Sequence, residues 1–169
     1  NSYAIGIGGP LAREKNLQRV SDLAKQPHLR AGFSHEFLNR EDGWPALREA
    51  YQLTHQPIGI EHALAYGAIE AGQLDFTDAY TTDGELAARN LVLLEDDRDF
   101  FPEYNAVLLG RADMPADIAA VLSKLEGLLN EATMQGLNHA VASGGESPDA
   151  VASAFLRERG LVAGTRPKE

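Results

Sequence analysis

Short segments of strand-like composition alternate with helical patterns over about the first hundred residues, and this alternation constrains the fold more than any other feature. Strands are expected at residues 3–8, 30–33, 57–60, 74–80, 90–94 and 106–109. Helices are expected from about residue 21, from residue 42 or 43 to about 53, and from about 61 to 71. An alternation of this kind predicts an α/β architecture.

Local residue chemistry sets the expected ends of these elements. Ser21 followed by Asp22 has the form of an N-cap with an acidic residue in the first turn. Residues 8–10 (GGP) are typical of a turn that ends the first strand. Pro45 suits the first turn of the second helix, and Gly72 suits the C-terminal end of the third.

Beyond Arg111 the pattern becomes helical. Three helices are expected here. The first begins near Pro115, the second carries the apolar residues 134, 137 and 141, and the third covers residues 148–160. The third has the strongest start signal, because Ser147 suits the N-cap, Pro148 the first position and Asp149 the positive end of the helix dipole. The sequence therefore predicts an α/β region followed by a mostly helical one, with a frayed tail at residues 164–169.

Charge and composition exclude several classes of function. The 169 residues include 25 acidic and 15 basic side chains, so the net charge is −10. A protein that binds nucleic acid or an anionic membrane would carry a basic face, so neither partner is expected. The absence of cysteine removes thiol nucleophiles, disulfides and thiolate metal sites. No apolar run approaches the roughly 20 residues that a membrane-spanning helix needs.

Four polar segments stand out as candidates for binding. They are residues 36–44 (EFLNREDGW), 78–84 (DAYTTDG), 95–105 (EDDRDFFPEYN) and 1–3 (NSY). In an open α/β sheet, ligands bind beyond the carboxyl ends of strands, which is where such polar segments are expected.

Each segment also has a purely structural interpretation. Arg40, among acidic neighbours, is equally well explained as part of a solvated salt-bridge cluster. Tyr80 and Tyr104 each suit the edge of a core, the commoner place for an isolated tyrosine. Asp96 and Asp97 are typical of turns and caps.

Motifs for catalysis, metal binding and phosphate binding are missing from the sequence. His35 and Glu36 are adjacent, but the other histidines show no ligand spacing, and the glycines at 6, 8 and 9 complete no phosphate-binding motif. No serine lies in a nucleophile elbow. We therefore expect no catalytic residue, no metal site, no cofactor and no enzymatic activity. An acid/base enzyme using Glu36, Asp42 or Asp83 is an alternative that nothing in the spacing requires.

The same segments resemble the substrate-binding proteins of the glycine betaine/carnitine/choline family of ABC transporters. Similar phrases occur at residues 1–4, 36–44, 68–75, 78–84, 94–97, 100–105 and 147–156, so the resemblance runs over the whole chain in order. It implies a periplasmic-binding-protein-like (type II) lobe, with a mixed sheet flanked by helices and an α-helical C-terminal segment. It also implies an extracytoplasmic protein, periplasmic or membrane-associated, that delivers a quaternary amine to a membrane permease.

The resemblance implies a set of ligand-binding residues between two lobes. Tyr3, Tyr80 and Tyr104 would form an aromatic cage around the quaternary ammonium group, and Arg40 would bind the ligand's carboxylate. The backbone of Asn1 would face the cation. The layer behind these residues, which orients Arg40 and links the lobes, would hold Glu36, Phe37, Asp42 and Thr81.

The resemblance also implies a division of the chain into two parts. Residues 1–104 would form one α/β ligand-binding lobe, and residues 105–169 would supply a return strand and helices that pack on another lobe. Members of the family carry a further stretch, comparable to a whole lobe, before the segment that matches residue 1. Apolar residues of the helices would then need cover from each other or from a second copy: Val121, Leu122, Leu125, Leu128, Met134, Leu137 and Phe155. The alternative function is a retained lobe that serves as a sensor or dimerisation module without transport-competent binding.

Overall fold

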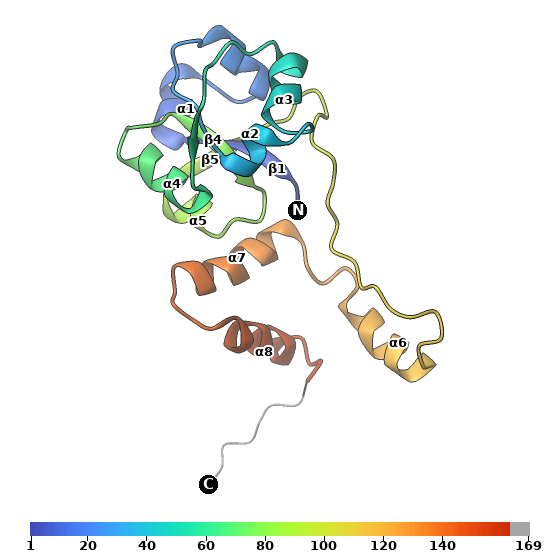
Figure 1. Cartoon of the computed structure of the whole chain (residues 1–169). Helices are drawn as coiled ribbons and strands as arrows, with labels where there is room; N and C mark the ends of the chain where they lie inside the picture. The colour runs from blue at the N-terminus through green and yellow to red at the C-terminus, as the bar shows by residue number, and fades with distance from the viewer. Residues whose placement is uncertain (163–169) are drawn as a thin grey trace.

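A computed structural model describes residues 1–162, and the tail for which fraying is expected lies outside them. Figure 1 shows an α/β lobe built from the first hundred residues and three helices below it, joined by a long extended connection. The chain start lies at the edge of the lobe that faces the helices. This arrangement agrees with the predicted α/β region followed by a helical one.

The lobe is organised around strand β1 (Tyr3–Gly8). This strand pairs antiparallel with β4 (Phe76–Tyr80) on one side and with β5 (Leu91–Leu94) on the other. A second pair, β2 (Gly32–Ser34) and β3 (Ile58–Ile60), is parallel, and a parallel bridge from Ala31 to Phe76 brings it alongside β4. The predicted mixed sheet flanked by helices is therefore confirmed.

The middle of β1 is buried on both faces, because helices cover both sides of the sheet. Ile5 and Ile7 are fully buried, and Ala4 on the opposite face is 7% exposed. A strand that is buried on both faces reads as a continuous apolar run, which is why residues 3–8 were recognisable as a strand. Six short helical segments surround it: α1 (Gly9–Lys15), η1 (Val20–Lys25), α2 (His35–Asn39), α3 (Trp44–Tyr51), α4 (His62–Glu70) and α5 (Glu85–Ala88).

The helices α3 and α4 confirm their predicted boundaries. Gly43 is the N-cap of α3, and Pro45 lies in its first turn, where a missing N–H costs nothing. Just beyond the end of α4, Gly72 has a φ of +66°, a left-handed conformation that glycine adopts without strain.

Two local predictions are wrong, one of a helix cap and one of a turn. Ser21 does not cap a helix: the segment Val20–Lys25 is a 3-10 helix, and the Asp22 carboxylate instead accepts the backbone N–H groups of Gln18 and Arg19. The GGP sequence is not a turn, because α1 begins at Gly9 with Pro10 in its first turn. Proline signals a helix start as readily as a turn, and burial of Gly9 against the sheet favours the helix here.

The strand predicted at residues 106–109 is also wrong. These residues form neither helix nor strand, and Leu109 is 98% exposed. A strand needs a neighbour to accept and donate its backbone hydrogen bonds, and no strand within residues 1–162 pairs with this segment. Its apolar composition is typical of a strand, but composition alone supplies no partner.

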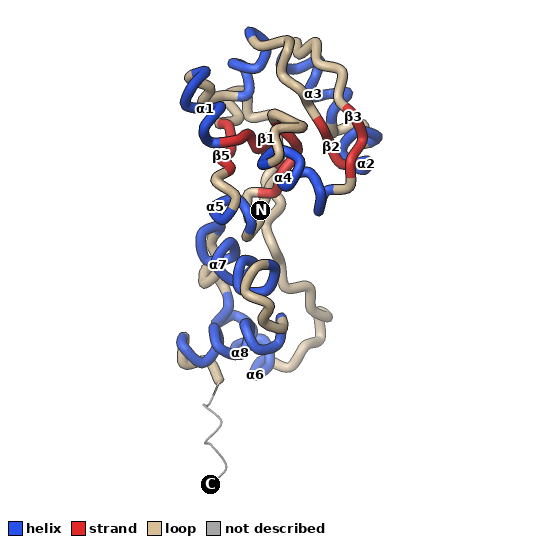
Figure 2. The backbone as a smooth tube through the Cα atoms, turned by 90° about the vertical axis from the view of Figure 1, so that its left-hand side faces the viewer, coloured by secondary structure: helices blue, strands red, loops and turns tan. Residues whose placement is uncertain are grey.

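The three predicted C-terminal helices are confirmed. They are α6 (Ala116–Leu122), extended by the 3-10 turn η2 (Ser123–Leu125), α7 (Glu131–Ala142) and α8 (Pro148–Glu158). Ser147 caps α8 by accepting the N–H of Ala150. Figure 2 shows these helices stacked beneath the lobe. Val151 is the one buried apolar residue in the described part of this region, so most of its apolar side chains stay partly or fully exposed.

Helix α7 is bonded to the lobe through the loop that follows β4. Side chains on one face of α7 bond three carbonyl oxygens of that loop: Gln135 Nε2 to Thr81 (2.6 Å), Asn138 Nδ2 to Thr82 (2.8 Å) and His139 Nδ1 to Gly84 (3.0 Å). The helical region therefore contacts the lobe at the segment that carries Tyr80.

Candidate ligand-binding site

The structure brings the three predicted cage residues together at one end of β1. In the antiparallel register, Tyr3 lies directly opposite Tyr80, and their ring centroids are 4.8 Å apart. Tyr104 meets Tyr3 edge to face, with centroids 6.4 Å apart. We call Tyr3, Tyr80 and Tyr104 the tyrosine cluster.

Backbone contacts near the chain start hold the third member of the cluster in place. The backbone N–H of Tyr104 donates to the carbonyl oxygen of Asn1 (2.8 Å), and the Ser2 hydroxyl donates to the carbonyl of Pro102 (2.9 Å). The side chain of Asn1 accepts the Thr82 hydroxyl (3.0 Å). The chain start thus joins the loop after β4 to the segment after β5, which places Asn1 beside the cluster.

Arg40 lies at the end of α2, next to the tyrosine cluster. Its Nε and Nη2 donate to the two carboxylate oxygens of Asp42, both at 2.8 Å, and its Nη1 donates to Glu36 at 3.3 Å. Its guanidinium carbon lies 5.8 Å from the centre of the Tyr3 ring. The Tyr3 hydroxyl donates to Glu36 and the Tyr80 hydroxyl donates to that of Tyr3, both at 3.2 Å. One hydrogen-bonded chain therefore joins Tyr80, Tyr3, Glu36, Arg40 and Asp42.

The electrostatics of this hydrogen-bonded chain stabilise the charged forms of Arg40 and Asp42 and the protonated form of Tyr3. The Arg40 guanidinium lowers the pKa of Asp42, and Asp42 in turn raises the pKa of Arg40. Burial, followed by the hydrogen bond from Tyr80, raises the pKa of Tyr3, so its hydroxyl stays protonated. Arg40, Glu36 and Asp42 together carry a formal charge of −1, which favours a cationic group nearby.

The remaining predicted residues support the cluster from behind. Phe37 is fully buried, with its ring centroid 5.3 Å from that of Tyr3. Thr81 exchanges two hydrogen bonds with Ser2: its N–H donates to the Ser2 carbonyl (3.0 Å), and its Oγ1 accepts the Ser2 N–H (3.1 Å). Phe101, which we did not predict, lies 6.4 Å from Tyr3 and is recognisable only as part of the aromatic segment 100–105.

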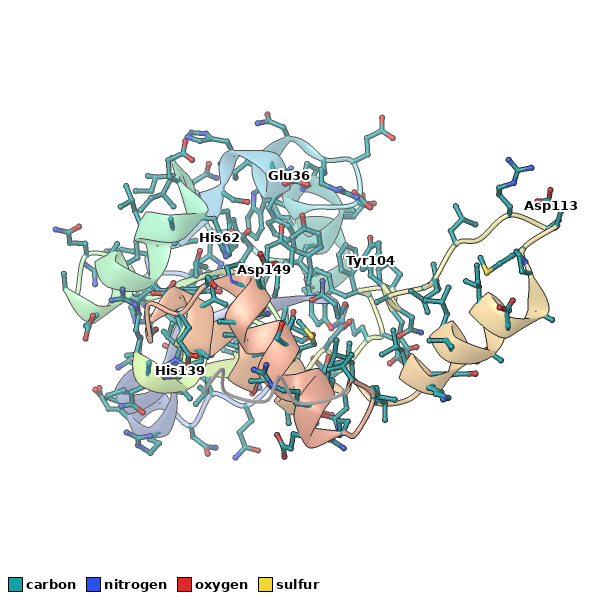
Figure 3. The ribbon with its side chains drawn as sticks, turned by 90° about the horizontal axis from the view of Figure 1, so that it is seen from below. Glu36, His62, Tyr104, Asp113, His139 and Asp149 are labelled. Atoms are coloured by element: carbon teal, nitrogen blue, oxygen red, sulfur yellow. The ribbon has the colours of Figure 1, made fainter. Side chains whose placement is uncertain are left out.

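A second group of residues behind Tyr80 was also missed. The His62 ring lies 5.2 Å from the ring of Tyr80 and is flanked by Asp78 and Asp83. Figure 3 shows Glu36, His62 and Tyr104 in the lobe, while Asp113 lies far out on the connection to α6. No spacing in the sequence marked His62, because its partners come from β4 and the loop after it.

The described part of the chain shows neither a metal-binding cluster nor a membrane-spanning helix. No group of three or more His, Asp or Glu residues suited to a metal ion occurs within residues 1–162. In the same part of the chain, no helix has the length and apolar character to cross a membrane.

Comparison with known families decides where this architecture belongs. Residues 1–158 match the family described as the substrate binding domain of ABC-type glycine betaine transport systems. The chain belongs to this family. The resemblance seen in the sequence, to substrate-binding proteins of glycine betaine, carnitine and choline transporters, is therefore confirmed.

Relatives of this substrate-binding domain are named as binding proteins. The carnitine transport binding protein OpuCC of Listeria monocytogenes is 32% identical, over 97% of this chain and 55% of its own length. A glycine-betaine-binding protein of Pseudomonas aeruginosa is 34% identical, over 96% of this chain and 57% of its own length. The chain thus spans little more than half the length of these relatives.

A solved structure agrees with the family assignment. A glycine betaine/carnitine/choline ABC transporter structure superimposes with a TM-score of 0.86 and 31% identity, over 95% of this chain and 61% of that one. A choline binding protein in complex with choline has the same fold, with a TM-score of 0.60 at 12% identity.

Proposed function

We propose that this chain is part of an extracytoplasmic solute-binding component of an ABC importer that binds a quaternary ammonium compatible solute of the glycine betaine, choline or carnitine type. The observation that carries the proposal is the tyrosine cluster with Arg40 beside it, formed by side chains from four separate segments. Membership of the family and the names of the relatives support it.

Aromatic rings suit this ligand for a physical reason. A trimethylammonium group has no N–H, so hydrogen bonds cannot recognise it, whereas the negative faces of aromatic rings attract its charge. Each desolvated contact contributes about 0.5–2 kcal/mol. Three rings would supply on the order of 4 kcal/mol, which must also offset the several kcal/mol lost on association. Micromolar affinity, about −8 kcal/mol, therefore needs further contacts besides the tyrosine cluster.

Arg40 is proposed to provide one of these contacts. Asp42 occupies the Nε–Nη2 edge of its guanidinium, and Glu36 bonds Nη1. Arginine has five N–H donors, so two remain for a ligand carboxylate after these three bonds. A charge-assisted hydrogen bond adds about 1.5–3 kcal/mol. Lysine would not replace Arg40, because its point charge lacks the planar fork.

The remaining parts of the proposal concern the whole protein. Residues 1–104 would be one of two lobes that close on the ligand, and the helices after residue 105 would pack mainly on the other lobe. The partner would be the membrane permease that receives the ligand from the closed form. The partly exposed apolar residues of α6 and α7 would allow self-association where that other lobe is missing.

Calorimetric titration with glycine betaine, choline and carnitine tests the proposal. It is run on this chain and on the complete gene product that contains it, both near neutral pH. Saturable binding of one of these solutes by the complete product is the expected result. Absence of binding by both proteins would refute the proposal and favour a sensor or dimerisation module.

A further inference from the structure

His62 lies directly behind Tyr80 and between two carboxylates from different segments. Its Nε2 is 3.3 Å from Oδ2 of Asp83, in the loop after β4, and its Nδ1 is 3.8 Å from Oδ2 of Asp78, in β4 itself. Its ring packs against the rings of Tyr80 (5.2 Å) and Tyr66 (5.3 Å), and its side chain is 30% exposed. Nothing in the proposed contacts with ligand uses this residue.

The geometry favours a proton on both ring nitrogens. Nδ1 is buried and has no hydrogen-bond partner, and the charged atom nearest to it is a carboxylate oxygen. A neutral imidazole would direct a lone pair at Asp78 or at Asp83, whereas an imidazolium directs an N–H at each. Within residues 1–162, each of these carboxylates forms an ion pair with His62 alone.

Both carboxylates are held by other groups, so His62 links two fixed points. Asp78 is 1% exposed and accepts the N–H and the hydroxyl of Ser34, both at 2.7 Å. Asp83 accepts the Tyr66 hydroxyl from α4 and the backbone N–H of Tyr80 (3.0 Å). His62 therefore joins the loop after β4 to the buried centre of the lobe, at the point where Tyr80 leaves the sheet.

We propose that His62, as an imidazolium bridging Asp78 and Asp83, is a positioning residue that holds Tyr80 and its loop in the ligand-binding arrangement, and that loss of its proton weakens ligand binding. The inference rests on the proposed function, since it assigns a role in binding a quaternary amine. It predicts that affinity for the ligand falls as the pH rises and His62 loses its proton.

The His62 imidazole is expected to titrate within a pH range in which ligand binding can be measured. The charged and ionisable groups that face His62 are Asp78 from β4, Asp83 from the loop, and the hydroxyl-bearing Tyr66 and Tyr80. Asp78, and then Asp83, raise the pKa of His62 to about 9. If only the protonated form positions Tyr80, the dissociation constant rises about fourfold between about pH 7 and about pH 9.5.

Binding of choline and of tetramethylammonium is measured by calorimetry on the complete gene product from about pH 7 to about pH 9.5. His62→Gln removes the charge, and His28→Gln is the matched control, because His28 is exposed in the loop before β2. The wild type and H28Q should lose affinity together by about fourfold, whereas H62Q should bind more weakly near pH 7 and show no pH dependence.

Other outcomes are also decisive. An H62Q profile that parallels the wild type overturns the proposal, as does affinity that rises with pH, which would mean that the imidazolium competes with the ligand for the Tyr80 ring. If H62Q does not fold, NMR titration of the wild-type imidazole decides: a pKa near its ordinary value of 6.5 overturns the proposal, and one near 9 supports it. If the wild type binds neither probe near pH 7, the pH series uses whichever of glycine betaine and carnitine it binds. Failure to bind any of these solutes refutes the proposed function, and the NMR titration still reports whether the bridge exists.

Discussion

Replacing Ser34 by alanine should destabilise the lobe far more than a helix-cap deletion usually does. The Ser34 hydroxyl makes two bonds at once: it accepts the N–H of Phe37 (3.1 Å) as the N-cap of α2, and it donates to the buried carboxylate of Asp78 (2.7 Å). Loss of an N-cap costs about 1 kcal/mol, and loss of a hydrogen bond to a charged group costs about 1.5–3 kcal/mol. The expected decrease in the free energy of unfolding is therefore about 3 kcal/mol.

The chain contains a matched control for this substitution. Ser147 caps α8 in the same way, accepting the N–H of Ala150 at 3.2 Å, but it is exposed and has no carboxylate partner. Ser147→Ala should cost only about 1 kcal/mol. Urea unfolding followed by far-UV circular dichroism measures both variants, and the difference of about 2 kcal/mol isolates the bond to Asp78. Equal destabilisation by the two variants would refute the reasoning, because it would show that Asp78 is satisfied without the hydroxyl.

Three further predictions concern the binding site and its contact with α7. Tyr80→Ala should weaken choline binding by calorimetry by about tenfold or more, and Tyr80→Phe by much less, because the ring face binds the cation; equal losses would assign the effect to the hydroxyl. Arg40→Ala should reduce affinity for glycine betaine or carnitine by roughly tenfold while sparing choline, which has no carboxylate; a uniform loss would mean that Arg40 maintains the fold. Gly84→Ala should separate α7 from the lobe, since a Cβ there would overlap the backbone of His139, and should speed amide hydrogen exchange in the loop after β4. Gly136→Ala, where a Cβ meets nothing within 4 Å, is the control, and similar exchange in both variants would contradict the docking of α7.

Helix ends and buried strands were predictable because their signals are local. Pro45, Gly72 and Ser147 act on the backbone within a few residues of themselves, so their effect does not depend on the rest of the fold. The strand expected at residues 106–109 shows the limit of such signals. Its apolar residues have strand character, but a strand forms only where another strand offers hydrogen bonds.

The same limit of local signals applies to the residues of the candidate site. The tyrosines and Arg40 were found because they lie in segments with a family resemblance, and their roles remain predictions. His62 was not predicted as a site residue, because nothing near it in the sequence indicates the two carboxylates that flank its ring. Those carboxylates lie 16 and 21 positions along the chain, and only the packing of α4 against β4 brings them to the ring.

The sequence by itself determined the α/β class of the lobe, the three C-terminal helices and the family. These follow from periodicity, capping residues and segment-by-segment similarity, all of which are properties of residues close together in the chain. Only the tertiary structure decided that Tyr3 faces Tyr80, that Glu36 joins them to Arg40, and that His62 bridges Asp78 and Asp83. Strand register and helix packing set such contacts, because a shift of one residue in β1 would turn Tyr3 to the opposite face of the sheet.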